Sequence, residues 1–209
     1  MPAVGGLLTC GLLVAGVGPA NAVDAAPSAS AATSAVAGVP DIQDDTASAA
    51  QSPVNMPKDP RDPVTFDDSV VAVTVPTDGT TTTSWSDGMT VYQGTDDAAS
   101  TVVQPTDSGA RFMTVISGPS APSDYRYNLD VPAGGSVAQD AGGSISVRDQ
   151  QGDQVAGIAP AWATDANGQS LPTSYSVDGT TVLQHVNLDG ATFPVVADPA
   201  FTVDCGWVT

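Results

Sequence analysis

The sequence predicts an all-β protein, either an antiparallel sandwich or a partly open barrel. Apolar and polar side chains alternate in short segments of residues 125–199, which is the period of a strand with one buried face. Turn sequences rich in glycine separate these segments at regular intervals. They are Pro132-Ala133-Gly134-Gly135, Gly142-Gly143, Gln151-Gly152-Asp153, Asn167-Gly168, Asp178-Gly179 and Asp189-Gly190. No window of helical period is longer than about two turns.

The first 22 residues have the pattern of a secretory signal peptide. The apolar run 4–17 is shorter than the roughly 18 to 20 residues that span a bilayer. The small residues of Ala20-Asn21-Ala22 predict cleavage after Ala22. We therefore predict a secreted, extracellular protein with no transmembrane segment in the mature chain. No Lys or Arg precedes the apolar run, which leaves the position of the true start codon open.

Residues 23–62 are predicted to form a disordered linker rich in Ala, Ser and Pro. The segment has no aromatic side chain and no sustained period, so it cannot bury enough apolar area to offset its ordering entropy. Its prolines stiffen its last third toward polyproline II. A short Ala-rich helix within residues 23–37 is the alternative, which the Ser, Pro and Thr residues and the lack of charge pairs weaken.

Residues 63–203 are the predicted all-β domain. Its first strand is the β-branched run 70–75, which ends at Pro76 and at the turn Asp78-Gly79. Further strands are expected at 81–85, 89–92, 101–103 and 111–117. The Pro-rich residues 118–122 are interpreted as a crossover between two sheets, because the roughly 50 residues before them would make a marginal domain alone. A domain boundary is the alternative.

The second half of this domain shows the alternation most clearly. Tyr125, Tyr127, Leu129 and Val131 are expected on the buried face of one strand, opposite Arg126, Asn128 and Asp130. Ile145 and Val147 are expected to point inward, and Ser144, Ser146 and Arg148 outward. Further strands are predicted at 155–159, 173–177, 180–186 and 193–197.

The chain is strongly acidic, with 23 Asp and Glu residues against five Lys and Arg residues and a formal net charge of -18. A nucleic-acid partner is not expected, because neutralising phosphates requires a basic surface. Anionic membrane surfaces are disfavoured for the same reason.

One cysteine, Cys205, remains after removal of the signal peptide, and it lies in a C-terminal tail of residues 204–209. A single thiol in an exported protein is unusual. It is a free thiol, forms an intermolecular disulfide, or has a partner beyond Thr209 in a longer parent protein. We favour the last alternative, in which the tail is truncated, because residues 201–203 and 207–208 resemble strands.

Four stretches resemble a β-domain of uncharacterised secreted actinomycete proteins. They are residues 125–132, 161–168, 175–179 and the closing strand Phe193-Pro194-Val195-Val196-Ala197-Asp198-Pro199. A similar closing strand also precedes repeat regions of large exported toxins. The resemblance covers residues 64–203 and implies export from a Gram-positive cell, with further chain often following. It implies no activity and no catalytic residues, and Phe201 stands where relatives often have Trp.

No catalytic residues are predicted, so we do not expect an enzyme. His185 is the only histidine, and alternation places it on the same face as Leu183. A zinc site of several histidines is therefore excluded, and no spacing identifies partners for a catalytic triad. No serine lies in a Gly-x-Ser-x-Gly motif.

No metal site or cofactor is predicted either. Residues 165–170 have the spacing of half a calcium loop, beginning at Asp165. The twelfth position holds Ser176, which cannot chelate as a glutamate would. An Asn167-Gly168 hairpin turn is the preferred interpretation. The acidic pairs at 67–68 and 96–97 are likewise expected to be solvated turn residues.

Aromatic side chains are expected to pack in the core, with one exception. Trp162 lies close to Pro160 in a turn-rich stretch, so we predict that it is the exposed aromatic and a binding residue. Such a surface suits a cell-wall polysaccharide or a protein partner. The predicted function is that of an exported non-enzymatic β-domain with a structural or interaction role at the cell surface or in the medium. The alternative is an accessory domain of a larger exported effector or toxin-like protein, whose active region lies beyond residue 209.

Overall fold

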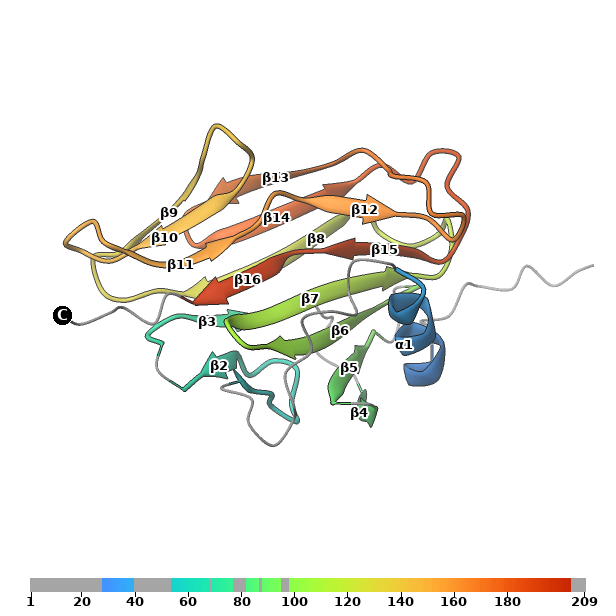
Figure 1. Ribbon diagram of the computed structural model, residues 1–209, viewed down its shortest axis with the longest axis horizontal. Helices are drawn as coiled ribbons and strands as arrows, with labels where there is room; N and C mark the ends of the chain where they lie inside the picture. Colours follow the sequence, from blue (N-terminus) through green and yellow to red (C-terminus); the bar gives the residue numbers. More distant parts are fainter. Residues whose placement is uncertain are drawn as a thin grey trace, which may run out of the picture.

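The computed structural model describes residues 28–39, 54–67, 69–76, 82–86, 88–94 and 98–203. These residues form mostly β-strands in two antiparallel sheets, with one short helix (Figure 1), which confirms the all-β prediction. The predicted signal peptide of residues 1–22, Cys205 and the 204–209 tail lie outside the described residues. No helix in the described part of the chain is long and apolar enough to cross a membrane.

The smaller sheet has six strands in the order β1-β2-β3-β8-β14-β13. Their bounds are β1 Val54–Asn55, β2 Val64–Phe66, β3 Ala72–Thr74, β8 Asp124–Asp130, β14 Thr181–Val186 and β13 Thr173–Asp178. The long pair β13 and β14 is joined by the predicted Asp178-Gly179 turn, where Gly179 has φ of 59°.

The larger sheet runs in the order β4-β5-β6-β7-β16-β11-β10-β9. The bounds are β4 Thr82–Ser86, β5 Met89–Gln93, β6 Ala99–Thr106, β7 Gly109–Ile116, β16 Ala200–Val203, β11 Gln154–Ile158, β10 Ile145–Arg148 and β9 Ser136–Gln139. Strand β15 (Val195–Asp198) pairs with one end of β7, and β12 (Trp162–Thr164) pairs with β15. The two C-terminal strands, β15 and β16, therefore pair one after the other along the same edge of the long strand β7.

The two sheets face each other across one hydrophobic core. The ring of Phe66 in the smaller sheet stacks on that of Phe201 in the larger sheet, with centroids 5.1 Å apart. Phe112 packs edge-on against both Phe201 and Tyr127, at 6.3 Å and 6.4 Å. The buried hydroxyl of Tyr127 forms a 2.8 Å hydrogen bond with the hydroxyl of Thr114. The contacts of Phe66 with Phe201 and of Tyr127 with Phe112 and Thr114 cross between the layers, so the two sheets pack on each other.

Alternation in the sequence predicts the faces of β8 correctly. Tyr125, Tyr127 and Leu129 are buried, whereas the polar residues that alternate with them, Arg126, Asn128 and Asp130, are exposed. The prediction is wrong for Ser146 in β10, which is buried although it points away from Ile145 and Val147. The segment 118–122 joins β7 of the larger sheet to β8 of the smaller sheet, which confirms the predicted crossover.

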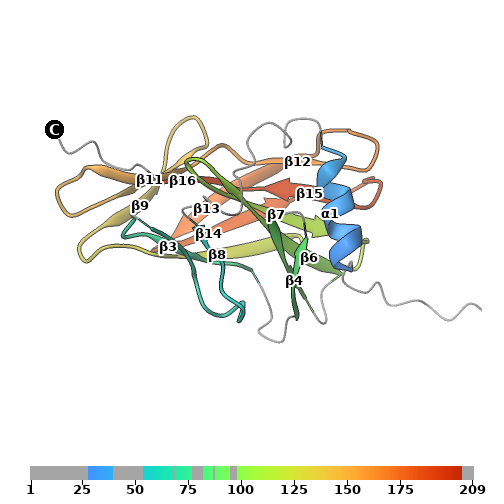
Figure 2. The same ribbon diagram turned by 60° about the horizontal axis from the view of Figure 1, so that its bottom comes forward.

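The linker prediction for residues 23–62 is wrong where the structure describes helix α1 (Ala29–Ala37) and strand β1. Ser28 caps the helix, and its hydroxyl accepts a 3.2 Å hydrogen bond from the backbone N–H of Ala31. The helix lies against the outer face of the larger sheet (Figure 2). Ala32 and Val36 are buried there in a second apolar cluster. This packing supplies the stability that so short a sequence lacks in isolation.

Helix α1 also explains why β6 and β7 are buried on both faces. One face of each strand contributes to the core between the sheets, and the other contributes Val102, Met113 and Val115 to the cluster under the helix. A strand covered on both sides loses the alternation of burial that a solvated sheet shows.

Candidate functional site

A pocket with a volume of about 740 Å³ lies beside β12, and we call it the Trp162 pocket. Strand β12 pairs only with β15 among the named strands, so it forms an edge of the larger sheet at this point. The pocket wall combines Arg111 of β7, Trp162 of β12, Thr173 of β13 and Asp198 of β15. A volume of this size is in the range of small-molecule binding sites.

Trp162 and Asp198 are direct partners in the antiparallel pair of β12 and β15. Residues opposite each other in such a pair project to the same face, with their Cβ atoms about 4.5–5.5 Å apart. Trp162 is partly buried and packs against the apolar cluster under α1. The pairing therefore brings an indole ring and a carboxyl group to the same wall of the pocket.

Asp198 is the most unusual ionisable residue of this site. Its side chain is buried, with 1% of the residue exposed, and neither carboxyl oxygen has a hydrogen-bond partner. Burial raises the pKa of Asp198 from 3.8 to about 7. The positive charge of Arg111 and the nearby indole N–H of Trp162 both lower this pKa, but by less than burial raises it. The indole N–H does not reach the geometry of a full hydrogen bond to the carboxyl group. The site thus holds a carboxyl group that ionises near neutral pH.

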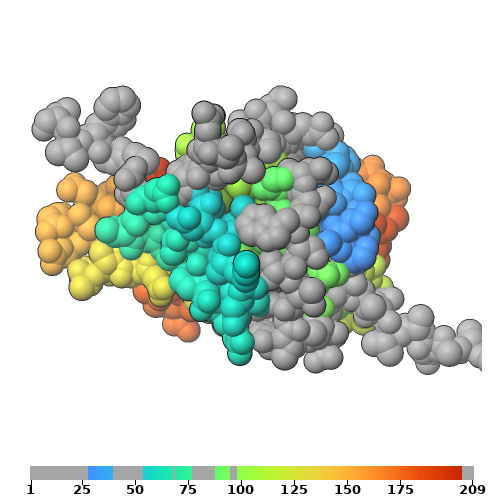
Figure 3. All heavy atoms as spheres, turned by 90° about the horizontal axis from the view of Figure 1, so that it is seen from below, coloured from blue at the N-terminus to red at the C-terminus, as the bar shows by residue number. Residues whose placement is uncertain are grey.

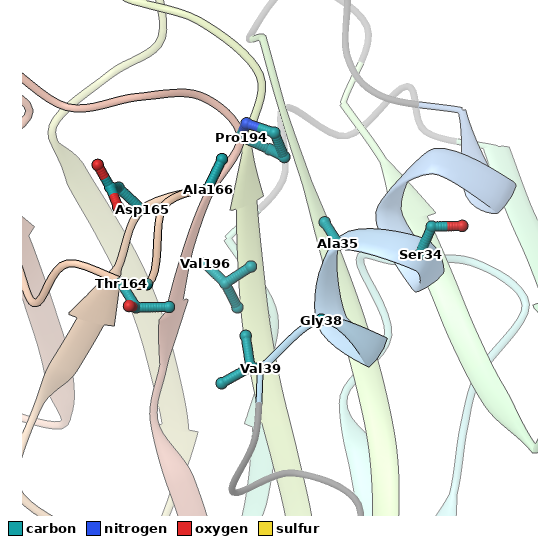
Figure 4. A pocket seen from close by; sticks show the side chains of 10 residues that line it. Ser34, Ala35, Gly38, Val39, Thr164, Asp165, Ala166, Pro194 and Val196 are labelled. Atoms are coloured by element: carbon teal, nitrogen blue, oxygen red, sulfur yellow. The ribbon is translucent and has the colours of Figure 1, made fainter.

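A second, smaller pocket of about 300 Å³ separates α1 from the turn after β12, and we call it the helix cleft. Figure 4 shows the end of the helix on one side and Thr164 and Ala166 on the other, with Val39 and Val196 between them. The lining is mainly apolar. Val39, Thr164 and Gly168 line both pockets, so the helix cleft adjoins the Trp162 pocket. In the space-filling view of Figure 3, α1 (blue) lies at the surface beside C-terminal residues (orange and red).

Asp165 organises the turn after β12 through hydrogen bonds that its carboxylate accepts from the backbone. Its Oδ1 accepts hydrogen bonds from the backbone N–H groups of Asn167 and Gln169, both at 2.9 Å. Its Oδ2 accepts another from the N–H of Thr192 at 3.1 Å. These bonds, that of Gln169 above all, lower the pKa of Asp165. Gly168 has φ of 76°, which confirms the predicted turn.

His185 lies on the exposed side of β14 together with Leu183, as alternation predicts. Its Nδ1 atom is 2.7 Å from Oδ1 of Asp124 on the neighbouring strand β8, and both side chains are about half exposed. An exposed pair of this kind contributes little to stability. His185 is not among the residues that line the Trp162 pocket.

The tyrosines pack in the core, as predicted. Tyr92, Tyr125, Tyr127 and Tyr175 are all buried. Trp162 lies in an edge strand instead of an irregular turn, and it is partly buried instead of fully exposed. The side chain of Trp85 and all of Trp207 lie outside the described residues. Binding by Trp162 stays a prediction.

Sequence reasoning did not identify Asp198 as a site residue. The signal that could have found it is an acidic residue that ends the apolar run Val195-Val196-Ala197. All four residues of β15 are buried, and a buried carboxyl group without a partner is rare in proteins. Within the described ranges, no group of three or more His, Cys, Asp or Glu side chains is arranged to hold a metal ion.

No protein-family model, curated protein or solved structure matches this chain. The resemblance to a secreted actinomycete β-domain therefore stays a prediction.

Proposed function

We propose that the chain is an exported, non-enzymatic β-domain that binds a partner at the cell surface or in the surrounding medium. The Trp162 pocket is the binding surface. The observation that supports this proposal is the pairing of Trp162 with the buried Asp198 on the wall of a pocket of about 740 Å³. Pockets that bind small groups are typically apolar, with a few polar atoms that fix orientation.

The non-enzymatic part of the proposal is supported by the placement of the one histidine. His185 is on the outer side of the smaller sheet and pairs with Asp124, whereas the pocket lies beside β12 of the larger sheet. The polar groups near Trp162 include no nucleophile with an adjacent base in the described residues. Such a site suits recognition more than acyl or phosphoryl transfer.

Sedimentation with insoluble cell-wall material tests this proposal. Purified protein is mixed with peptidoglycan or with wall polysaccharide, and the bound fraction is measured. We expect the native protein to sediment and Trp162→Ala to remain in solution. Asp178→Asn, which changes an exposed acid at the end of β13, is the control and should sediment like the native protein.

Two results would count against the proposal. Equal sedimentation of the native protein and Trp162→Ala would remove the pocket as the binding surface. Recovery of the protein from the cytosol, with its N-terminal residues intact, would show that the protein is not exported. An exported protein should instead begin at Val23.

A further inference from the structure

Asp198 requires a hydrogen-bonding partner that the described part of the fold does not supply. Buried polar side chains in proteins are nearly always paired, because an unpaired group loses its interactions with water without replacement. Both oxygens of Asp198 are buried and unpaired, and the residue lines the Trp162 pocket. Both oxygens are inaccessible to solvent in this structure. A molecule in this pocket that offers hydroxyl or N–H groups would therefore satisfy the carboxyl group when the side chains that line the pocket move to uncover it.

Trp162 adds a second requirement, which concerns the shape of that molecule. Because the indole is opposite Asp198 in the strand pair, a molecule bonded to the carboxyl group also meets the indole. Part of the indole packs on the apolar cluster under α1, which restricts its motion. A fixed aromatic ring favours a ligand with a flat apolar face. The ligand therefore has an apolar face and hydrogen-bond donors along its edge.

The charges around the pocket disfavour a strongly ionic ligand. Arg111 and Asp198 line the same pocket and carry opposite charges when both are ionised. A cationic ligand would be repelled by Arg111. An anionic ligand would be repelled by Asp198 and by the net charge of -18 of the chain. Each repulsion is a penalty for an ionic ligand. A neutral ligand avoids both penalties.

We propose that the Trp162 pocket binds the neutral ring of a saccharide, whose C–H face stacks on Trp162 and whose hydroxyl groups bond to Asp198. A sugar ring has the apolar face and the hydroxyl edge that the two side chains require. The volume of about 740 Å³ accommodates more than one such ring. This inference rests on the proposed binding function and names its ligand.

Titration of the full chain with soluble saccharides tests the inference. The probes are neutral oligosaccharides of glucose, galactose, mannose and arabinose, followed by calorimetry and by saturation-transfer NMR. Inorganic phosphate and a lysine-containing peptide serve as charged probes. We expect at least one neutral oligosaccharide to bind, and neither charged probe to compete with it.

Three variants locate the binding. Trp162→Ala should weaken binding of that oligosaccharide at least about tenfold, whereas Trp162→Phe, which keeps an aromatic face, should lose about threefold. Asp198→Asn keeps the shape of the side chain but removes the ionisable group, and should weaken binding about tenfold. Asp178→Asn should bind like the native protein. Circular dichroism and thermal unfolding of each variant establish that it is folded.

The outcomes separate the two proposals. If no saccharide binds but sedimentation with wall material still depends on Trp162, the saccharide inference is wrong and the binding function stands. The same holds if only the peptide or phosphate binds. If a saccharide binds equally well to Trp162→Ala and Asp198→Asn, the ligand lies elsewhere and the inference is wrong. If neither saccharide nor wall material is bound, the proposed function itself fails.

Discussion

Replacing Asp198 by asparagine should make the protein more stable at pH 8 and change the way its stability depends on pH. Burial raises the pKa of this carboxyl group from 3.8 to about 7. The folded state therefore holds the proton more tightly than the unfolded state does. The stabilisation due to this proton is complete below the unfolded pKa of 3.8, and it is lost as the pH rises through about 7.

The size of this effect follows from the same numbers. Each tenfold change in proton affinity corresponds to about 1.4 kcal/mol, so the shift from 3.8 to about 7 amounts to about 4 kcal/mol at full ionisation. Asparagine has a similar shape and does not ionise, so its own burial cost is the same at every pH. The difference in unfolding free energy, Asp198→Asn minus native, should therefore increase by about 4 kcal/mol between pH 4 and pH 8.

Urea denaturation at pH 4, 5.5, 7 and 8 measures this difference. The native curve alone is not sufficient, because 23 acidic residues against five basic ones also make a rise in pH unfavourable. Asp178→Asn removes one exposed acid and serves as the control for this general repulsion. A constant difference between Asp198→Asn and the native protein across this range would refute the assignment of a buried, unpaired carboxyl group.

Three further predictions concern the fold. Gly109→Ala should destabilise the protein by about 3 kcal/mol in urea denaturation, because its Cβ would lie 2.2 Å from the carbonyl oxygen of Phe201. Gly142→Ala is the control and should be near neutral, because its Cβ would meet nothing within 4 Å. Equal effects of the two substitutions would contradict the close approach of Gly109 to Phe201. Asp165→Asn should lower the melting temperature at pH 7, because the carboxylate accepts three backbone hydrogen bonds. The decrease in melting temperature should become smaller as the pH falls below 3.8, because the carboxylate of the native protein is then protonated. A decrease that is independent of pH would argue against hydrogen bonding by the ionised carboxylate. Ala32→Glu should displace α1 and increase binding of the dye ANS, because Ala32 is completely buried on the larger sheet; unchanged dye binding would show that the helix does not cover this face.

The sequence predicts strands well where one face of the strand is buried and the other is exposed to solvent. In β8 the side chains alternate between core and solvent, and the faces follow from the residues alone. Strand β12 is harder, because three residues next to a proline give too short a pattern, and only the pairing with β15 makes the segment a strand. Helix α1 lies within the range 23–37 that was given for a short helix only as the alternative to a linker. The linker was preferred because the apolar residues of this segment are mostly alanines, and the stability of the helix comes from the sheet beneath it.

The candidate site could be predicted only in part. Trp162 was identified from the sequence because it lies close to Pro160 in a turn-rich stretch, where an aromatic side chain is expected to be exposed. Asp198 is distant from it along the chain, and the two meet only through the register of β12 and β15. The lack of a partner for the carboxyl group depends on which atoms surround it, and no sequence pattern encodes that arrangement.

The position of β7 has a consequence for how this protein is made. One edge of β7 pairs with β6, which directly precedes it, but the other pairs with β15 and β16, the last strands described. During synthesis that second edge therefore stays open until the C-terminal strands have left the ribosome. An open edge of apolar strand is prone to pair with other chains. Nascent copies of this chain are accordingly exposed to edge-to-edge pairing with one another until β15 and β16 are available to cover this edge.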